Sequence, residues 1–103
     1  MTGLSGRKYF GGTVGLMIYW HPQDGHIRCE IHTRRSRQRA ECLLSPDGTP
    51  CRFTLNPDTG HDVSGTLWLA ADGSATVLMG RLDLGRDGRF EGVIGRWSGD
   101  RPP

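Results

Sequence analysis

Four arginines fall within six consecutive positions of the chain, in the stretch from His32 to Cys42. They are Arg34, Arg35, Arg37 and Arg39, and we expect Arg28 and Arg52 to lie near them. A guanidinium group binds phosphate or carboxylate through two parallel hydrogen bonds, which a lysine ammonium cannot do. The stretch therefore predicts an anion-binding surface for nucleic acid or an acidic protein. It contains no aromatic side chain on which a base could stack, and a charged corner with no specific partner is the alternative.

Cysteine and histidine together offer a second type of site. Cys29 and His32 have the C-x2-H spacing of zinc ligands, and Cys42 and Cys51 could complete a set. In a strand, however, residues three positions apart point to opposite faces. We therefore expect the three cysteines to be core residues without a metal or any other cofactor. A disulfide between Cys42 and Cys51 across the SPDG turn is compatible with this arrangement.

Acid–base chemistry would depend on the four histidines, which are His21, His26, His32 and His61. None of them stands in an evident arrangement with a nucleophile and a carboxylate. The sequence contains no G-x-S-x-G, H-E-x-x-H, P-loop or G-x-G-x-x-G motif. We therefore expect a binding protein and not an enzyme.

A two-part pattern resembles the signature of PilZ domains, which are small β-barrels that bind cyclic di-GMP. Arg35-x-x-x-Arg39 matches the first part of that signature, and Asp62-x-Ser64 matches the start of the second. The glycine that closes the family's second part is Leu67 in this chain. The resemblance implies that Arg35 and Arg39 hold phosphate and guanine, with Asp62 and Ser64 across the barrel surface. A PilZ-like cyclic di-GMP-binding domain is therefore one alternative function.

The segments that must position these residues are short and regularly spaced. Sixteen glycines and six prolines gather mostly in clusters such as HPQDG, SPDGT and NPDTGHD, which have the composition of tight turns. The intervening segments predict strands at 8–20, 26–34, 38–44, 51–55, 63–70, 75–84 and 89–97. No segment has sustained helical periodicity. The chain therefore predicts an all-β fold, a single small antiparallel barrel or sandwich with little or no helix.

Alternation along these strands separates core residues from surface residues. In the strand over 26–34, one face carries Ile27, Cys29, Ile31 and Thr33 and the other carries His26, Arg28, Glu30, His32 and Arg34. In the strand over 8–20, the core face carries Phe10, Val14, Leu16, Ile18 and Trp20. The arginine stretch then becomes an exposed hairpin corner between the second and third strands.

A second surface follows from the hairpins near the C-terminus. A two-residue turn at Asp72-Gly73 places Trp68 opposite Val77, and a three-residue loop with a left-handed Gly88 places Val77 beside Trp97. The face opposite the core then collects Trp68, Val77, Met79, Val93 and Trp97. Tryptophan and methionine are enriched at interface cores. This face predicts a homodimer or another protein contact, and burial under a further part of the same chain is the alternative.

The length, charge and cysteine content of the chain indicate its domain organisation and general class. The 103 residues fit one domain over 1–103, with a frayed tail expected at 98–103. The first 52 residues carry eight Lys and Arg against four Asp and Glu, so this half is basic. An odd number of cysteines and the lack of a long apolar segment favour a cytoplasmic protein with no membrane partner. We expect a non-catalytic module of inhibitor or adaptor type that docks on a protein or nucleic acid, and a nucleic-acid-binding β-barrel is the other alternative.

Overall fold

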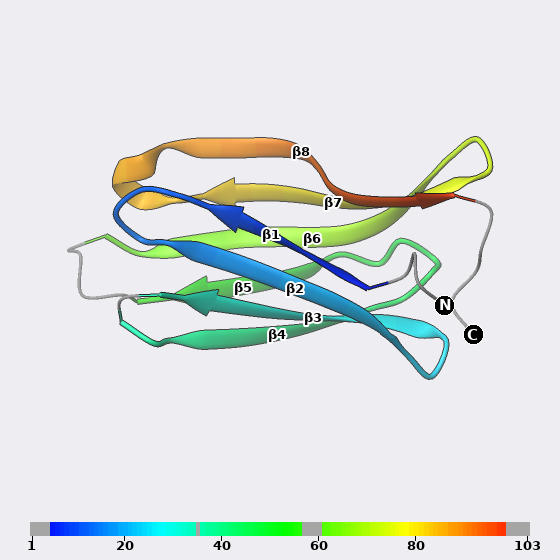
Figure 1. The fold of residues 1–103 in the computed structure, drawn as a ribbon, viewed down its shortest axis with the longest axis horizontal. Helices are drawn as coiled ribbons and strands as arrows, with labels where there is room; N and C mark the ends of the chain where they lie inside the picture. The colour runs from blue at the N-terminus through cyan, green and yellow to red at the C-terminus, as the bar shows by residue number, and fades with distance from the viewer. Residues whose placement is uncertain (1–4, 35, 57–60, 99–103) are drawn as a thin grey trace.

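The computed structural model describes residues 5–34, 36–56 and 61–98. Its strands are β1 (Gly6–Phe10), β2 (Leu16–Gln23), β3 (His26–Thr33), β4 (Arg39–Leu44), β5 (Cys51–Leu55), β6 (Val63–Asp72), β7 (Ala75–Asp83) and β8 (Arg89–Ser98) (Figure 1). The described residues contain no α-helix, and a short 3-10 turn, η1 (Gly85–Asp87), joins β7 to β8. The all-β prediction is therefore confirmed. Of the tail expected over 98–103, only Ser98 is described, and it ends β8.

The strands form two antiparallel sheets of four strands each. Sheet A has the order β1-β2-β3-β4, and sheet B has the order β5-β6-β7-β8. Within each sheet, every strand pairs with the next strand along the chain, as expected for a meander. Over the described ranges, pairing does not continue from β4 to β5 or from β8 to β1, and so the strands form no closed barrel.

The strand predicted over 8–20 is in fact two strands, β1 and β2, which pair with each other. The chain reverses between them at a glycine-rich turn, where Gly12 and Gly15 have φ angles of 95° and 64°. Glycine adopts these left-handed angles without the steric penalty that other residues meet. Glycine at these two positions therefore allows the reversal that ends β1 and begins β2.

Asp87 in η1 fastens this turn to the other sheet. Its carboxylate accepts hydrogen bonds from the backbone N–H groups of Thr13 and Val14, each at 3.1 Å. A Cβ atom on Gly12 would lie 2.6 Å from the carboxylate. The close approach therefore requires glycine at this position, in addition to the requirement of its φ angle.

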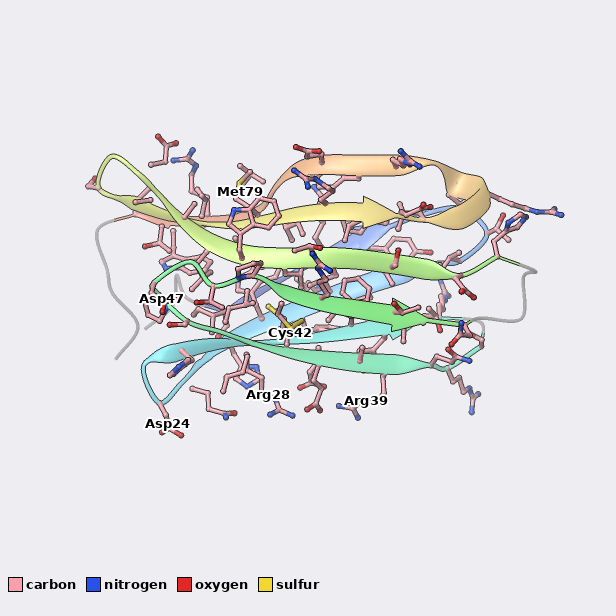
Figure 2. All side chains as sticks on the ribbon, turned by 180° about the vertical axis from the view of Figure 1, so that it is seen from behind. Asp24, Arg28, Arg39, Cys42, Asp47 and Met79 are labelled. Atoms are coloured by element: carbon pink, nitrogen blue, oxygen red, sulfur yellow. A yellow bond between two sulfur atoms is a disulfide. The ribbon has the colours of Figure 1, made fainter. Side chains whose placement is uncertain are left out.

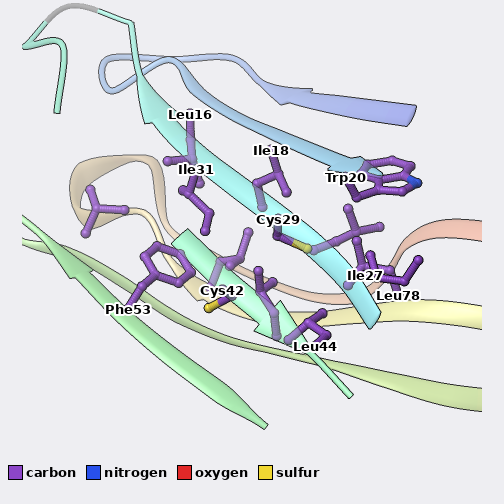
Figure 3. Packing of buried hydrophobic residues seen from close by; sticks show 14 of the residues in the cluster. Leu16, Ile18, Trp20, Ile27, Cys29, Ile31, Cys42, Leu44, Phe53 and Leu78 are labelled. Carbon is purple, nitrogen blue, oxygen red and sulfur yellow. The ribbon is translucent and has the colours of Figure 1, made fainter. Parts of the chain in front are cut away.

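The two sheets share one hydrophobic core. The inward positions predicted for Ile27, Cys29 and Ile31 are confirmed, because each of these residues is fully buried. Figure 3 shows the packing of core side chains from sheet A, such as Cys29, against Phe53 and Leu78 of sheet B. The alternation of strand β3 therefore specifies the core face of sheet A.

A disulfide joins Cys42 of β4 to Cys51 of β5, with the two Cα atoms 5.9 Å apart (Figure 2). It links sheet A to sheet B at the point where hydrogen-bonded pairing is interrupted. Cys42 is buried, Cys51 is half-buried against the core, and Cys29 is a buried free thiol. The predicted core positions hold for Cys29 and Cys42, whereas Cys51 lies at the border of the core.

The β6–β7 hairpin differs from the expected register by one loop position. Its two-residue loop begins at Gly73 and not at Asp72, and Trp68 therefore lies opposite Met79 instead of Val77. Gly73 has a φ angle of 61°. Tight two-residue hairpin loops require a positive φ at their first position, and this requirement places glycine there.

A bulge in β8 moves Trp97 from the predicted outer face into the core. The register shifts between Leu78 and Met79, so that Met79 pairs with Val93 but Thr76 pairs with Trp97. An extra residue in one strand turns the following side chains to the opposite face. Trp97 is only 4% exposed and belongs to the shared core. The predicted tryptophan face therefore retains Trp68 and loses Trp97.

Candidate anion-binding site

The outer face of sheet A carries most of the predicted arginine chemistry. One row across the four strands consists of Tyr9, Met17, His32 and Arg39. The adjacent row consists of Arg7, Tyr19, Glu30 and Glu41. Residues on either side of these positions in β2 and β3 face the core, and so both rows point away from it.

A pocket of about 640 Å³ opens on this face. It is lined by Arg7, Tyr9, Gly15, Met17, Tyr19, His32, Thr33, Arg34, Arg37 and Arg39, and we call it the Arg–Tyr pocket. Among the described residues, the lining holds four arginines and two tyrosines but no carboxylate. Its composition suits an anion that also has apolar or aromatic parts, and its size is within the usual range for ligand sites.

The β3–β4 turn presents two of the pocket arginines. Its anchor is Thr33, which is 2% exposed and whose hydroxyl accepts a hydrogen bond from the backbone N–H of Gln38 at 3.0 Å. The backbone N–H of Arg34 donates to the carbonyl of Gly15 at 3.0 Å, which ties this turn to the β1–β2 turn. Arg37 adopts a φ angle of 55°, an uncommon conformation for a residue other than glycine. The two turns together therefore form one end of the pocket.

Two arginines of this face are neutralised by neighbouring carboxylates. Arg39 lies 2.9 Å from a carboxylate oxygen of Glu30 and 3.0 Å from one of Glu41. Arg28 lies 2.6 Å from the same oxygen of Glu41. Figure 2 shows Arg28 and Arg39 pointing outward from sheet A. Their charge is therefore already engaged, and they contribute less to the attraction of a ligand.

The remaining three pocket arginines have a different environment. In the part of the chain that the structure describes, Arg7, Arg34 and Arg37 form no ion pair with a carboxylate. All three side chains are exposed. Unpaired guanidinium groups can bind an anion without first losing an internal partner. The unneutralised positive charge of this face therefore lies in the Arg–Tyr pocket.

The pocket also contains exposed aromatic surface. Tyr9 is 45% exposed and Tyr19 is 38% exposed. The Tyr19 ring meets the His32 ring edge to face, with the centroids 5.4 Å apart. These residues come from β1, β2 and β3, and so the structure brings aromatic rings to the arginine stretch that its own sequence lacks. Sequence reasoning missed Arg7, Tyr9, Met17 and Tyr19, although their positions between the core residues of 8–20 could have indicated them.

Three of the predicted anion-binding arginines lie outside the Arg–Tyr pocket or outside the described residues. Arg52 is on the outer face of sheet B, where it lines a hollow of about 300 Å³ with Arg81 and Arg89. Arg35 is not among the described residues. Arg28 is on the outer face of sheet A but does not line the Arg–Tyr pocket. The structure therefore brings Arg34, Arg37 and Arg39 together and separates them from Arg52.

The residues of the PilZ-like pattern are distributed over both sheets. Arg39 faces outward from sheet A, and Ser64 lines the hollow on the outer face of sheet B. Asp62 precedes β6 and accepts a hydrogen bond from the side-chain amide of Asn56 at 2.6 Å. The described members of the pattern therefore do not converge on one pocket.

The predicted tryptophan face is smaller than expected. Trp68, Met79 and Val93 share the outer face of sheet B, and Val93 is 42% exposed. The guanidinium carbon of Arg81 lies 6.0 Å from the centroid of the Trp68 ring. Val77, placed on this face by the sequence, is only 4% exposed. The remaining apolar patch consists of Trp68, Met79 and Val93.

The described residues were found to match neither a metal centre nor a known protein family. Within the described ranges, no group of three or more His, Cys, Asp or Glu side chains could hold a metal ion. No described helix is long and apolar enough to cross a membrane. No protein-family model matches this chain, and comparisons with curated proteins and with solved structures find no significant match. The Arg–Tyr pocket is therefore the feature from which a function can be proposed.

Proposed function

We propose that this protein is a non-catalytic binding module that holds an anionic macromolecule in the Arg–Tyr pocket. The observation that carries the proposal is the unneutralised charge of Arg7, Arg34 and Arg37 in a pocket whose described lining residues include no carboxylate. Guanidinium groups that have no carboxylate partner favour phosphate or carboxylate ligands. A protein of inhibitor or adaptor type can act through such a surface without performing a reaction.

The test removes the three unpaired charges together, as Arg7→Gln, Arg34→Gln and Arg37→Gln. The variant should remain folded, because exposed charges contribute little to stability. It should elute from immobilised heparin at a clearly lower salt concentration than the wild type, since each lost contact weakens the electrostatic attraction.

A matched control removes three exposed arginines outside the pocket, as Arg52→Gln, Arg86→Gln and Arg89→Gln. This control has the same net charge as the pocket variant. If the pocket is the binding site, the control should elute close to the wild type. Equal losses in both variants would show that only the total charge matters, and the proposal would then be wrong.

A cyclic dinucleotide is a second candidate ligand. The pocket volume of about 640 Å³ suits a ligand of that size. Arg39, to which the PilZ resemblance assigns a role with phosphate and guanine, lines the pocket. Titration with cyclic di-GMP in a calorimeter tests this alternative, and saturable binding that the triple pocket variant loses would support it.

We propose the outer face of sheet B as a second contact surface. If the two sheets are the layers of a small β-sandwich, each layer has one outer face for a partner. Trp68, Met79 and Val93 form the apolar part of this face, and a two-fold homodimer would bury each patch against its copy. A single-chain mass by light scattering at high protein concentration would exclude the homodimer.

The state of the three cysteines bears on the cellular compartment of the protein. The odd number of cysteines led to the expectation of a reducing cytoplasm. The Cys42–Cys51 disulfide instead is of a kind that is stable mainly in oxidising compartments. Thiol counting in protein isolated under alkylating conditions distinguishes these cases, because a cytoplasmic protein should have three free thiols and an exported one should have one.

A further inference from the structure

A second hollow adjoins the Arg–Tyr pocket on the outer face of sheet A. It has a volume of about 480 Å³, and Tyr19 and His32 line both hollows. The second hollow also includes His21 and Glu30, and its described lining residues include no arginine. The two hollows therefore form one extended surface, with strong positive charge at one end and the Tyr19–His32 ring pair in the middle.

The uneven distribution of charge over the two hollows indicates where the anionic groups of a ligand bind. The anionic groups of the ligand fit best among Arg7, Arg34 and Arg37, because these guanidinium groups have no carboxylate partner among the described residues, whereas the second hollow offers no unpaired arginine there and its Glu30 carboxylate is paired with Arg39. The exposed rings favour planar groups beside those anions. Base stacking on aromatic side chains together with arginine contacts to phosphates is the usual way in which proteins bind single strands.

We propose that the ligand of the Arg–Tyr pocket is a single-stranded nucleic acid whose bases stack on Tyr9 and Tyr19 and whose phosphates bind Arg7, Arg34 and Arg37. This inference rests on the proposed function and gives it a ligand class. Because Tyr19 and His32 line both hollows, a strand bound in the Arg–Tyr pocket can continue into the second hollow.

Duplexes and acidic proteins fit this surface less well. Aromatic rings on the face of a sheet can stack only on bases whose flat faces are accessible. Such unstacked bases occur in single strands and not inside a duplex. An acidic peptide could pair with the arginines, but it would gain nothing specific from Tyr9 and Tyr19. The exposed tyrosines are therefore the feature that separates a single strand from other polyanions.

The experiment measures binding by fluorescence anisotropy with a labelled oligothymidylate of about twelve nucleotides. A typical stacked base contributes enough that its loss weakens binding at least about fivefold. Tyr9→Leu with Tyr19→Leu should therefore lose about twenty-fold or more in affinity. The matched control, Tyr9→Phe with Tyr19→Phe, keeps both rings and should bind within about twofold of the wild type.

A comparison with the wild type alone tests the same point without any substitution. The labelled single strand should bind at least about tenfold more tightly than a duplex of the same length at equal salt. Equal affinity for the duplex would overturn the inference. Equal affinity of the Leu and wild-type proteins for the single strand would overturn it as well.

Failure of this inference can be separated from failure of the proposed function. If the Arg7, Arg34 and Arg37 variant loses heparin binding while the Leu variant keeps single-strand binding, the pocket binds polyanions without stacking. If cyclic di-GMP displaces the oligonucleotide at far lower concentration, the ligand is a dinucleotide and the single-strand inference is wrong. If neither heparin nor the oligonucleotide binds, both proposals are wrong.

Discussion

The reactivity of the free thiol of Cys29 is set by its burial in the core. Cys29 is fully buried on β3, where it packs in the core shared by both sheets. Burial raises the pKa of this thiol to about 12, because the charged thiolate cannot be solvated there. The thiolate is the reactive form of cysteine, and so Cys29 should be inert while the protein is folded.

We expect the folded, oxidised protein to show no thiol that reacts with Ellman's reagent at about pH 8, and one reactive thiol per chain after unfolding in urea. The raised pKa of Cys29 also makes the free energy of unfolding depend on pH. Because the folded-state pKa lies above the unfolded value of about 8.5, the stabilisation that comes from burying the neutral thiol is fully present below about pH 8.5 and is lost as pH rises toward 12. Rapid labelling of the folded protein would contradict the prediction.

Part of the candidate site could be read directly from the sequence at this scale. Arg34, Arg37 and Arg39 are neighbours in the chain, and their grouping needs no tertiary information. Tyr9 and Tyr19 could be recognised as members of the same site only after β1 and β2 had been separated and registered against β3. The pairing of Arg39 with Glu30 and Glu41 also depends on cross-strand register.

At the scale of elements, the contact between η1 and the β1–β2 turn connects the two sheets through a single carboxylate. The backbone N–H groups of Thr13 and then Val14 lower the pKa of the Asp87 carboxyl, since they favour its charged form. The turn that this carboxylate holds includes Gly15, which lines the Arg–Tyr pocket and binds the backbone of Arg34. Asp87 therefore supports the pocket from the other sheet.

Asp87→Asn should lower the melting temperature at neutral pH, because the N–H groups of Thr13 and Val14 bind different carboxylate oxygens, and asparagine has only one oxygen to accept them. A folded-state pKa below the usual value means that the stabilisation is present above about pH 4 and disappears as pH falls. Thermal unfolding followed by circular dichroism should show the variant and wild type converging in acid. Asp24→Asn, in an exposed turn, is the matched control and should leave the melting temperature unchanged.

Most elements of the fold were predictable because turn residues separate them so regularly. The strands expected at 26–34, 38–44 and 51–55 match β3, β4 and β5 within a residue. The fate of Trp97 was not predictable, because the bulge that turns it inward is a property of β7 and β8 together. Core packing selects that register, and a count of residues from the loop cannot reveal it.

At the scale of the whole molecule, the two sheets are held together along both of their borders. On one border, the indole ring of Trp20 lies between Gly6 of β1 and Gly95 of β8, and a Cβ on either glycine would lie 2.5 Å from the ring. Phe10 and Phe90 meet on the same border at a centroid distance of 5.0 Å. The other border is closed by a covalent bond, the disulfide between β4 and β5. Packing therefore closes one border, whereas the second depends on the redox state.

Reduction of the Cys42–Cys51 disulfide should lower the free energy of unfolding by roughly 2–3 kcal/mol, because it removes a constraint on a short loop of the unfolded chain. Urea unfolding of the wild type and of Cys42→Ala with Cys51→Ala, with and without reductant, measures the loss, and reductant should have no effect on the double variant. The Arg–Tyr pocket is lined by β1–β4 and their connecting turns, so anion affinity should survive reduction wherever the protein remains folded. A reduced protein as stable as the oxidised one would show that the shared core alone holds the sheets together, and loss of binding without unfolding would show that the pocket depends on the covalent link.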